Sequence, residues 1–521
     1  MLADRRGLLR LAAATAAGAW LPRGSRAQPR LGFDPFSLGV ASGSPTPDGL
    51  VLWTRLLPPG LFDRLGDAPV PVRWEVAHDE GFSRIARHGE AVASAELAHS
   101  VHAEVQGLAP DRWYFYRFIA GGVASPVGRT RTLPAPDAPA ARLRLAYASC
   151  QRWEHGHYAA WRHMQGEGLD FVLFLGDYIY EYPSAAAAVR NFPTLGLATT
   201  LADYRDRYAQ YRSDPALQAM HAACPWLLAW DDHEVQNDYA GVNAGDARPV
   251  GLNAARDFLA RRAAAYQAYY EHMPVRAAAF SRAVAGGQLR LHERHRFGRL
   301  ADLLLLDTRQ WRDPQACGRP QRPAGLVDPA ACPALQDPAR SLLGAAQERW
   351  LDERLAESAA ATWTVLGQQT LFGPRDNLPG PGERLWNDGW DGYPAARQRL
   401  VDGLRRHRVA NPVVLGGDVH ENWVGHVLAD YRRPEGPALG VEFCGTSITS
   451  HANGAALAAQ RLAENPHFVF ADGWKRGYGV CEFTPGALTT TLRAVDDPAR
   501  ADSGIGTLAR FAVQAGGRRV E

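Results

Sequence analysis

Five short clusters of polar residues hold the side chains that could do chemistry in this chain. Each cluster follows an apolar run and combines acids or amides with cysteine, tyrosine or histidine. In chain order they are Ser149-Cys150, residues 176–181 (G-D-Y-I-Y-E), residues 231–238 (D-D-H-E-V-Q-N-D), residues 367–369 (G-Q-Q) and residues 416–422 (G-G-D-V-H-E-N). A single cluster has a simple structural explanation, because an Asp after Gly can form a turn and a Cys can fill a core. Five of them together indicate a metal or acid–base site.

The elements that would position these clusters are apolar runs of strand length. They occupy residues 143–150, 170–177, 226–233, 301–309, 363–369 and 411–420, and helical stretches span residues 158–166, 201–223, 256–272 and 345–358. Apolar strands that alternate with helices predict a buried α/β sheet. Such sheets place their chemistry at the carboxyl ends of strands, which is where the polar clusters fall.

The chain divides into regions of different pattern. Residues 36–134 contain short alternating or apolar runs separated by Pro and Gly turns, which predicts an N-terminal β-sandwich. A Pro/Ala-rich linker follows at residues 132–139. The α/β pattern then predicts a catalytic domain over residues 141–490, and residues 491–521 are expected to be a C-terminal tail.

Residues 1–27 have the pattern of a twin-arginine signal peptide. Arg5 and Arg6 precede an Ala-rich apolar stretch, and small residues lead to a cleavage site at Ala27. The apolar stretch is short for a membrane span, and no later run approaches one. We therefore expect a periplasmic or secreted protein that uses the twin-arginine export machinery and has no stable membrane anchor. Because that route carries folded proteins and commonly cofactor-loaded ones, a metal site is expected.

Composition excludes several other classes of protein. The chain has 521 residues, of which 46% are hydrophobic, and 57 basic against 55 acidic residues give a net charge of +2. No basic excess is present, so no specific nucleic-acid partner is expected. Lys475 is the only lysine, which excludes a P-loop because that motif needs a Gly-Lys pair.

The six cysteines do not form a disulfide scaffold. Cys317 and Cys332 close a short Pro-rich loop and are the expected pair in an oxidising compartment. Cys224, Cys444 and Cys481 stand in apolar contexts and are expected to be small buried residues.

Two aromatic stretches have alternative interpretations. Residues 204–212 alternate tyrosine with arginine; a packed aromatic helix face with solvated arginines is favoured over a nucleic-acid surface. Residues 386–393 (W-N-D-G-W-D-G-Y) fit either the wall of a substrate cleft or a turn held by packed tryptophans.

The ordered set of motifs resembles the alkaline phosphatase D (PhoD-like) family of calcineurin-like metallophosphoesterases. The motifs are A-S-C, G-D-Y-I-Y-E, W-D-D-H-E-V-Q-N-D-Y, G-Q-Q and G-G-D-V-H-E-N-W, and the resemblance runs from about Leu38 to Phe483. It implies an α/β fold with an N-terminal β-sandwich and a metallophosphoesterase-type domain of two β-sheets packed between helices. It also implies a mixed centre of one Fe(III) with one or two Ca(II).

On this resemblance the metal ligands are Cys150, Asp177, Tyr180, Asp232, Gln368, Asp418 and His420. Anionic thiolate and phenolate donors stabilise Fe(III), which places Cys150 beside Tyr180. The oxygen donors suit Ca(II), whereas Zn(II) favours nitrogen and sulfur. Asn237 and Asp238 are a further pair that could bind metal or substrate.

His233 is the expected catalytic residue, because in relatives the equivalent histidine faces the leaving group and can protonate it. The alternative is a structural histidine bonded to Glu234. The implied reaction is in-line attack on phosphorus by a metal-bound hydroxide, without a Ser or Cys nucleophile. The substrate is a small or polymeric phosphoester; phosphodiesterase or phospholipase D-like activity is the alternative on the same site. An inactive secreted binding protein and an iron redox enzyme are the competing classes.

Overall fold

The computed structural model describes residues 31–521 except 186–187, 193–194, 247–254 and 281–287. The predicted signal peptide, residues 1–27, lies outside the described residues. No described helix has both the length and the apolar character needed to cross a bilayer.

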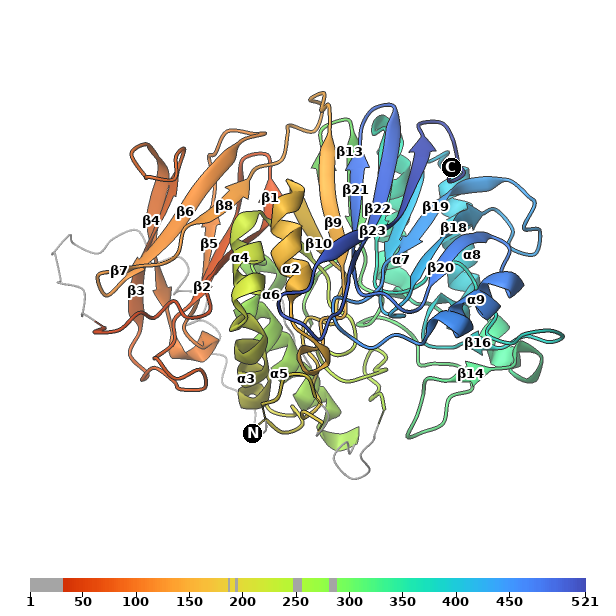
Figure 1. Ribbon diagram of the computed structural model, residues 1–521, viewed down its shortest axis with the longest axis horizontal. Helices are drawn as coiled ribbons and strands as arrows, with labels where there is room; N and C mark the ends of the chain where they lie inside the picture. The colour runs from red at the N-terminus through yellow and green to blue at the C-terminus, as the bar shows by residue number, and fades with distance from the viewer. Residues whose placement is uncertain (1–30, 186–187, 193–194, 247–254, 281–287) are drawn as a thin grey trace.

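Two large β-sheets lie face to face at the centre of the molecule (Figure 1). The nine-stranded sheet has the order β23 (Ile505–Gln514), β22 (Ala487–Val495), β21 (Gly477–Phe483), β9 (Leu143–Ala148), β10 (Phe171–Phe174), β11 (Trp226–Leu228), β1 (Val40–Thr46), β2 (Gly49–Arg55) and β5 (Ser100–Val105). The seven-stranded sheet has the order β12 (Glu293–Phe297), β13 (Ala301–Leu305), β15 (Trp363–Gly367), β17 (Pro412–Gly416), β19 (Ala438–Cys444), β18 (Asn422–Leu428) and β20 (Phe468–Asp472). Aliphatic and aromatic side chains from both sheets form the core between them.

Helices cover the outer faces of both sheets. On the nine-stranded sheet these are α2 (Ala159–Met164), α3 (Leu201–Arg212), α4 (Pro215–Ala223) and α5 (Ala255–His272). On the seven-stranded sheet they are α7 (Gly344–Glu357) and α8 (Pro394–Arg406). The short helices α6 (Ala277–Phe280) and α9 (Ala455–Glu464) complete the set of described α-helices. The prediction of two β-sheets packed between helices is therefore confirmed.

The central strands of both sheets run parallel, which explains their uninterrupted apolar sequences. β9, β10 and β11 are parallel neighbours, as are β13, β15 and β17. Every residue of β13, β15 and β17 is buried, because a core lies on each face of the sheet. Their carboxyl ends face the same side of the molecule, and the polar clusters follow there.

The N-terminal region forms a sandwich that shares a sheet with the catalytic region. Its outer layer is the sheet of β4 (Ile85–Ala93), β3 (Val70–Ala77), β6 (Trp113–Ala120) and β7 (Val123–Ala124), with β8 (Gly128–Arg131) also paired to β6. Its other layer is β1, β2 and β5, packed on it through one apolar core. β1 pairs with β11 in parallel at Gly43 and Trp226, so this layer continues the nine-stranded sheet.

The structure refines two sequence expectations. The predicted helix over residues 201–223 is two helices, because Asp214 caps α4 through the N–H groups of Ala216 and Leu217, with Pro215 as its first residue. Residues 491–521, the predicted tail, contribute the end of β22 and the whole of β23 to the edge of the nine-stranded sheet.

Other predictions are confirmed. Cys317 and Cys332 form a disulfide, and Cys224, Cys444 and Cys481 are free and buried. The tyrosines of α3 are buried in the core as predicted. The expectation that the arginines of this helix are solvated is wrong for Arg207 and Arg212, which are each only 1% exposed. Within the loop closed by the Cys317–Cys332 disulfide, β14 (Leu326–Val327) pairs antiparallel with β16 (Leu385–Trp386).

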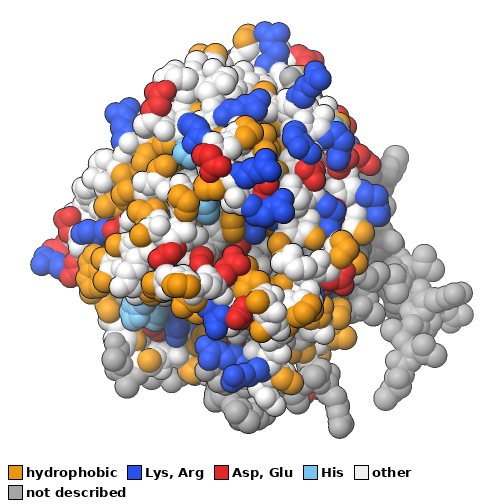
Figure 2. All heavy atoms as spheres, turned by 90° about the vertical axis from the view of Figure 1, so that its right-hand side faces the viewer, with side chains coloured by type: hydrophobic (Ala, Val, Ile, Leu, Met, Phe, Trp, Pro, Cys, Tyr) orange, Lys and Arg blue, Asp and Glu red, His pale blue; other side chains and the backbone are white. Residues whose placement is uncertain are grey.

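Charges of both signs are interspersed on the face formed by the right-hand side of Figure 1 (Figure 2). This mixture agrees with the near-equal numbers of basic and acidic residues in the chain.

Candidate metal centre

Sharp turns after the parallel strands aim the predicted ligands into one region. Cys150 follows β9, Asp177 follows β10, and Asp418 and His420 follow β17. All four have positive φ angles, between 57° and 65°. A residue with a Cβ adopts this conformation at a cost, and such residues cluster at functional sites.

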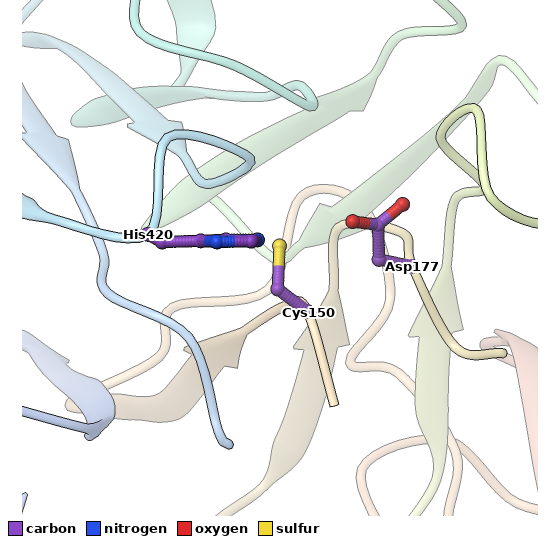
Figure 3. Close-up of side chains that lie close together, drawn as sticks. All are labelled: Cys150, Asp177 and His420. Atoms are coloured by element: carbon purple, nitrogen blue, oxygen red, sulfur yellow. The ribbon is translucent and has the colours of Figure 1, made fainter. Parts of the chain in front are cut away.

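The first group of candidate ligands comprises Cys150, Asp177 and His420 (Figure 3). One ligand atom from each lies within 4.8 Å of the others. Tyr180 joins them, because its hydroxyl donates to Asp177 Oδ2 at 2.8 Å and lies 3.3 Å from His420 Nε2. A thiol, a phenol, an imidazole and a carboxylate thus converge on one point.

The tautomer of His420 suits metal binding. Its Nδ1 lies 2.8 Å from the carbonyl oxygen of His451, which can only accept, so Nδ1 carries the proton. Nε2 is then left with its lone pair toward Tyr180. Burial lowers the pKa of His420 to about 4, which keeps the ring neutral as a ligand must be.

The second group shares Asp177 with the first. Asp177, Asp232 and His233 have ligand atoms within 4.8 Å of one another. Asp232 Oδ2 accepts the backbone N–H of Asp238 at 2.7 Å, while its buried Oδ1 has no partner in the described part of the chain. A carboxylate common to two groups is the arrangement that a bridged pair of metals requires.

His233 is paired with a residue that the sequence interpretation did not single out. Its Nδ1 lies 2.7 Å from Glu181 Oε2. Glu234, the partner in the alternative interpretation, instead accepts backbone N–H groups of Asp177, Tyr178 and Asp231. The alternative of a His233–Glu234 pair is therefore wrong. Burial lowers the pKa of His233, but Glu181, Asp177 and Asp232 outweigh it and raise that pKa well above its usual value.

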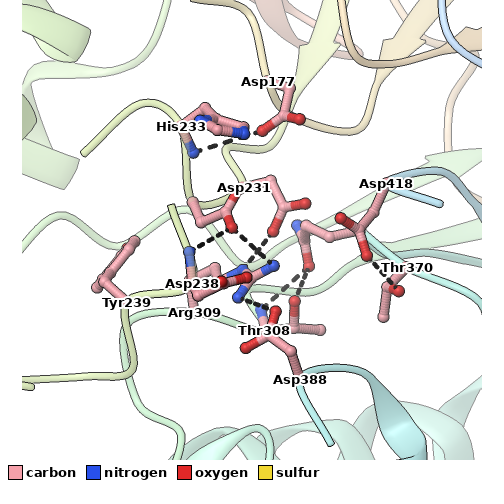
Figure 4. A network of polar contacts seen from close by, with 12 residues as sticks. Asp177, Asp231, His233, Asp238, Tyr239, Thr308, Arg309, Thr370, Asp388 and Asp418 are labelled. Atoms are coloured by element: carbon pink, nitrogen blue, oxygen red, sulfur yellow. Dashed lines mark hydrogen bonds and ion pairs between the residues drawn. The ribbon is translucent and has the colours of Figure 1, made fainter. Parts of the chain in front are cut away.

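Asp232 also belongs to a third group, with Asp238 and Asp388. Figure 4 shows Asp238 and Asp388 beside Arg309. Asp388 comes from the aromatic stretch 386–393. Arg309, after β13, forms ion pairs with Asp231, Asp232 and Asp388. The sequence offered a weak signal for both, since Arg309 ends a predicted strand and Asp388 lies in a polar loop, but neither could be paired with a partner.

Asp418 belongs to none of these groups of described residues, and the amides Gln368 and Asn237 both bond other protein groups. Asp418 Oδ2 accepts the hydroxyl of Thr370 at 2.6 Å. Gln368 is committed to the protein, because its Oε1 accepts from Trp390 Nε1 and the Thr370 N–H at 3.0 and 3.2 Å, which uses both lone pairs. Asn237 donates from its amide to Asp238 at 2.7 Å.

The position of Trp390 bears on the two interpretations of residues 386–393, a cleft wall or a turn held by packed tryptophans. Its side chain is buried in the core beneath α8 and holds the amide of Gln368. The stretch is therefore a turn held by a packed tryptophan, and the same turn presents Asp388 to the acidic groups.

The buried acidic side chains of this region favour the binding of cations. Burial raises the pKa of Asp177 and Asp238, and raises that of Asp418 to about 6. The charge of His233 opposes the shift at Asp177, and that of Arg309 opposes it at Asp418. Asp232 differs: burial raises its pKa, but Arg309 and His233 outweigh burial and lower it. Burial and Asp177 also raise the pKa values of Cys150 and Tyr180. Carboxylates crowded in a buried region need positive charge, and a metal would reverse these shifts.

Comparison with known families fits this geometry. A model described as PhoD-like phosphatase matches residues 145–492, and one described as PhoD-like phosphatase, N-terminal domain, matches residues 23–134. The chain belongs to the PhoD-like phosphatase family. The resemblance inferred from the motifs is thereby confirmed.

Individual relatives of this PhoD-like phosphatase agree. Alkaline phosphatase D of Bacillus subtilis (strain 168) is 44% identical over 500 residues, covering 94% of this chain and 82% of the relative. A solved structure of PhoD matches with a TM-score of 0.87 and 43% identity, covering 96% of this chain and 93% of that one. This PhoD-like phosphatase is a phosphoric ester hydrolase.

Proposed function

We propose that this PhoD-like phosphatase is an exported, metal-dependent hydrolase that releases phosphate or an alcohol from phosphoesters without a covalent enzyme intermediate. The observation that carries the proposal is the position of the Asp177 carboxylate, which lies within 4.8 Å of ligand atoms of Cys150 and His420 in one group and within 4.8 Å of Asp232 in another. Two cation positions bridged by one carboxylate suit a reaction in which charge develops on several phosphoryl oxygens.

Donor chemistry assigns a different metal to each position. Cys150, Asp177, Tyr180 and His420 would hold Fe(III), since thiolate and phenolate are its strongest donors in the cluster. Asp177, Asp232 and Asp418 would hold Ca(II), which prefers hard oxygen ligands. Asp238, Asp388 and Asn237 are the residues for a second Ca(II). When bound, these ions supply positive charge to the phosphoryl oxygens and lower the pKa of a water molecule.

Gln368 takes a different role from the ligand role expected from sequence. Because both lone pairs of its oxygen are used by Trp390 and Thr370, we propose that it positions Thr370, which in turn donates to Asp418. Gln368 would thereby orient the ligand Asp418 through Thr370.

His233 would donate the proton to the leaving alkoxide. Glu181 stabilises the imidazolium through the 2.7 Å contact, and a protonated ring cannot bind metal. The imidazole packs against the ring of Tyr180, with 4.1 Å between the ring centroids and a tilt of 32° between the ring planes, which limits its orientation. Ser149 has no role as nucleophile in this scheme.

Export rests on Arg5, Arg6 and the apolar stretch that follows. Substituting both arginines by lysine should retain the protein in the cytoplasm. Cell fractionation measures this, and unchanged export would contradict the twin-arginine route.

The deciding experiment is elemental analysis of protein purified without chelators, combined with hydrolysis of p-nitrophenyl phosphate and bis-p-nitrophenyl phosphate. Iron with calcium, and turnover that a calcium chelator removes, is the expected result. The ratio of the rates on the two substrates shows whether the enzyme prefers phosphomonoesters or, as in the phosphodiesterase and phospholipase D-like alternatives, phosphodiesters. Zinc alone would overturn the assignment of metals, and bound metal without hydrolysis would overturn the reaction.

A further inference from the structure

A cavity remote from the metal-ligand groups lies where the N-terminal strands meet helix α3. Its volume is about 220 Å³, the space of about seven water molecules at ~30 Å³ each. Leucine and alanine side chains and His99 form part of its wall, and three arginines, Arg55, Arg64 and Arg205, also line it. The one carboxylate in its lining is Asp67, an exposed residue.

Arg55, the last residue of β2, is only 1% exposed and is held by neutral partners. Its Nε donates to the carbonyl of Ala98 at 2.9 Å, and its Nη1 lies 2.8 Å from His272 Nε2. His272 Nδ1 lies 2.6 Å from the carbonyl oxygen of Ala268, so Nδ1 carries the proton and Nε2 accepts from Arg55. Arg55 Nη2 has no hydrogen-bond partner within the described residues. Because Arg55 lines the cavity and its other nitrogens are bonded, Nη2 is the atom left to face it.

The nearby carboxylates are committed to the other two arginines. Glu271 accepts from Arg205 Nε and Nη2 at 2.7 and 2.6 Å, and Asp206 pairs with Arg64. Arg55 itself forms no ion pair with any described residue. Burial lowers the pKa of Arg55 to about 10; the charge of Glu271 opposes this shift, whereas the charges of Arg64 and Arg205 add to it.

A buried guanidinium without a direct ion pair is costly, and here the charge of Glu271 offsets the removal of Arg55 from water only in part. The cavity supplies space for an additional negative charge, and an oxyanion matches the free N–H groups of arginine. We propose that the cavity binds a small tetrahedral oxyanion of the phosphate class against Nη2 of Arg55. The anion would join β2 to α3 at the boundary between the N-terminal and catalytic regions.

The test is equilibrium dialysis of the metal-loaded, full-length protein with radiolabelled inorganic phosphate. Phosphate also binds a hydrolytic site, so the difference between variants is decisive rather than the total. Wild-type protein is expected to bind one more phosphate per chain than Arg55→Met, with kcat/KM on p-nitrophenyl phosphate unchanged. Because the readout is a difference, it holds whether or not the proposed hydrolytic mechanism is correct.

Arg212→Met is the matched control, because Arg212 is equally buried and donates to the carbonyl of His272 but does not line the cavity. It should keep the full phosphate count. Equal counts for wild type and Arg55→Met would overturn the proposal.

Asp67→Asn keeps the test decisive if Arg55→Met fails to fold. Removing the carboxylate from the lining should tighten the additional site by about two- to tenfold, the scale of one partly screened charge. An unchanged affinity of that site would overturn the proposal. Sulfate should compete for the additional site, since it has the same tetrahedral shape.

Discussion

The pairing of His233 with Glu181 decides how the leaving group can be protonated. Both side chains are buried, and the 2.7 Å contact places a carboxylate behind the imidazole. Glu181 raises the pKa of His233, so the acid form persists to higher pH than in a free histidine. A general acid of this kind works only while it is protonated.

Replacing Glu181 by Gln should therefore lower the pKa of His233 and move the alkaline limb of the kcat profile to lower pH. The sign follows from the direction of the shift, because a lower pKa means that the proton is lost earlier as pH rises. The profile on p-nitrophenyl phosphate measures this. Glu482→Gln, which changes a partly exposed carboxylate on β21, should leave the profile in place. An unmoved alkaline limb in Glu181→Gln would rule out His233 as the acid.

A substitution at Cys150 tests the assignment of iron to the first group of ligands. Cys150→Ala removes the thiol from the group with Asp177 and His420, and it should reduce iron content and turnover together. Cys481→Ala, another free buried thiol, should retain both. Mass spectrometry of the metals measures iron, and full iron content in Cys150→Ala would contradict its role as a ligand.

Helix α3 contacts two loops of the metal region through the hydroxyl of Tyr211. Tyr211 is buried, and its hydroxyl accepts the backbone N–H groups of Trp153 and Tyr180 at 3.2 and 3.1 Å. It therefore ties together the loops that follow β9 and β10. The helix is itself fixed at its start by a capping box between Thr200 and Asp203.

Tyr211→Phe should leave two buried N–H groups unpaired and lower the free energy of unfolding by about 1–3 kcal/mol. Because Tyr180 belongs to the first ligand group, iron occupancy should fall as well. Thermal unfolding and metal analysis measure the two effects. Tyr270→Phe, on α5, is the matched control and should retain iron; normal iron in Tyr211→Phe would show that α3 does not position Tyr180.

At the scale of the whole molecule, the nine-stranded sheet joins three distant parts of the chain. Strands from the N-terminal region lie at one edge and β22 with β23 at the other. Val513 on β23 is 2% exposed and packs in the core between the two sheets, whereas its neighbour Gln514 is exposed. The last strand is thus part of the structure that holds the strand ends in place.

Val513→Ala should lower the free energy of unfolding by about 1.5–3 kcal/mol, from the loss of two buried methyl groups and the cavity they leave. Gln514→Ala, on the opposite face of the same strand, should change it by less than about 0.5 kcal/mol. Thermal unfolding compares the two variants. Equal stabilities would show that β23 does not contribute to the shared core.

By itself, the sequence determined the features that depend on short stretches of chain. The apolar runs identified the central strands, and the short loop between Cys317 and Cys332 identified the disulfide pair. The polar residues that follow the strands included the candidate metal ligands Cys150, Asp177, Asp232 and His420. Each signal is local, because the period of side chains along a strand and the residues that follow it are written in neighbouring positions.

Only the tertiary structure decided which charged groups meet. Glu181 lies 52 positions before His233 in the chain yet contacts it, while the adjacent Glu234 turns to backbone N–H groups around Asp177. Arg309, after β13 of the seven-stranded sheet, and Asp388, in the loop after β16, join the acidic groups, and β1 continues the catalytic sheet from the N-terminal region. Such contacts follow from how the sheets pack and how strands are ordered. Those arrangements depend on the burial of side chains far apart in sequence, so no local pattern contains them.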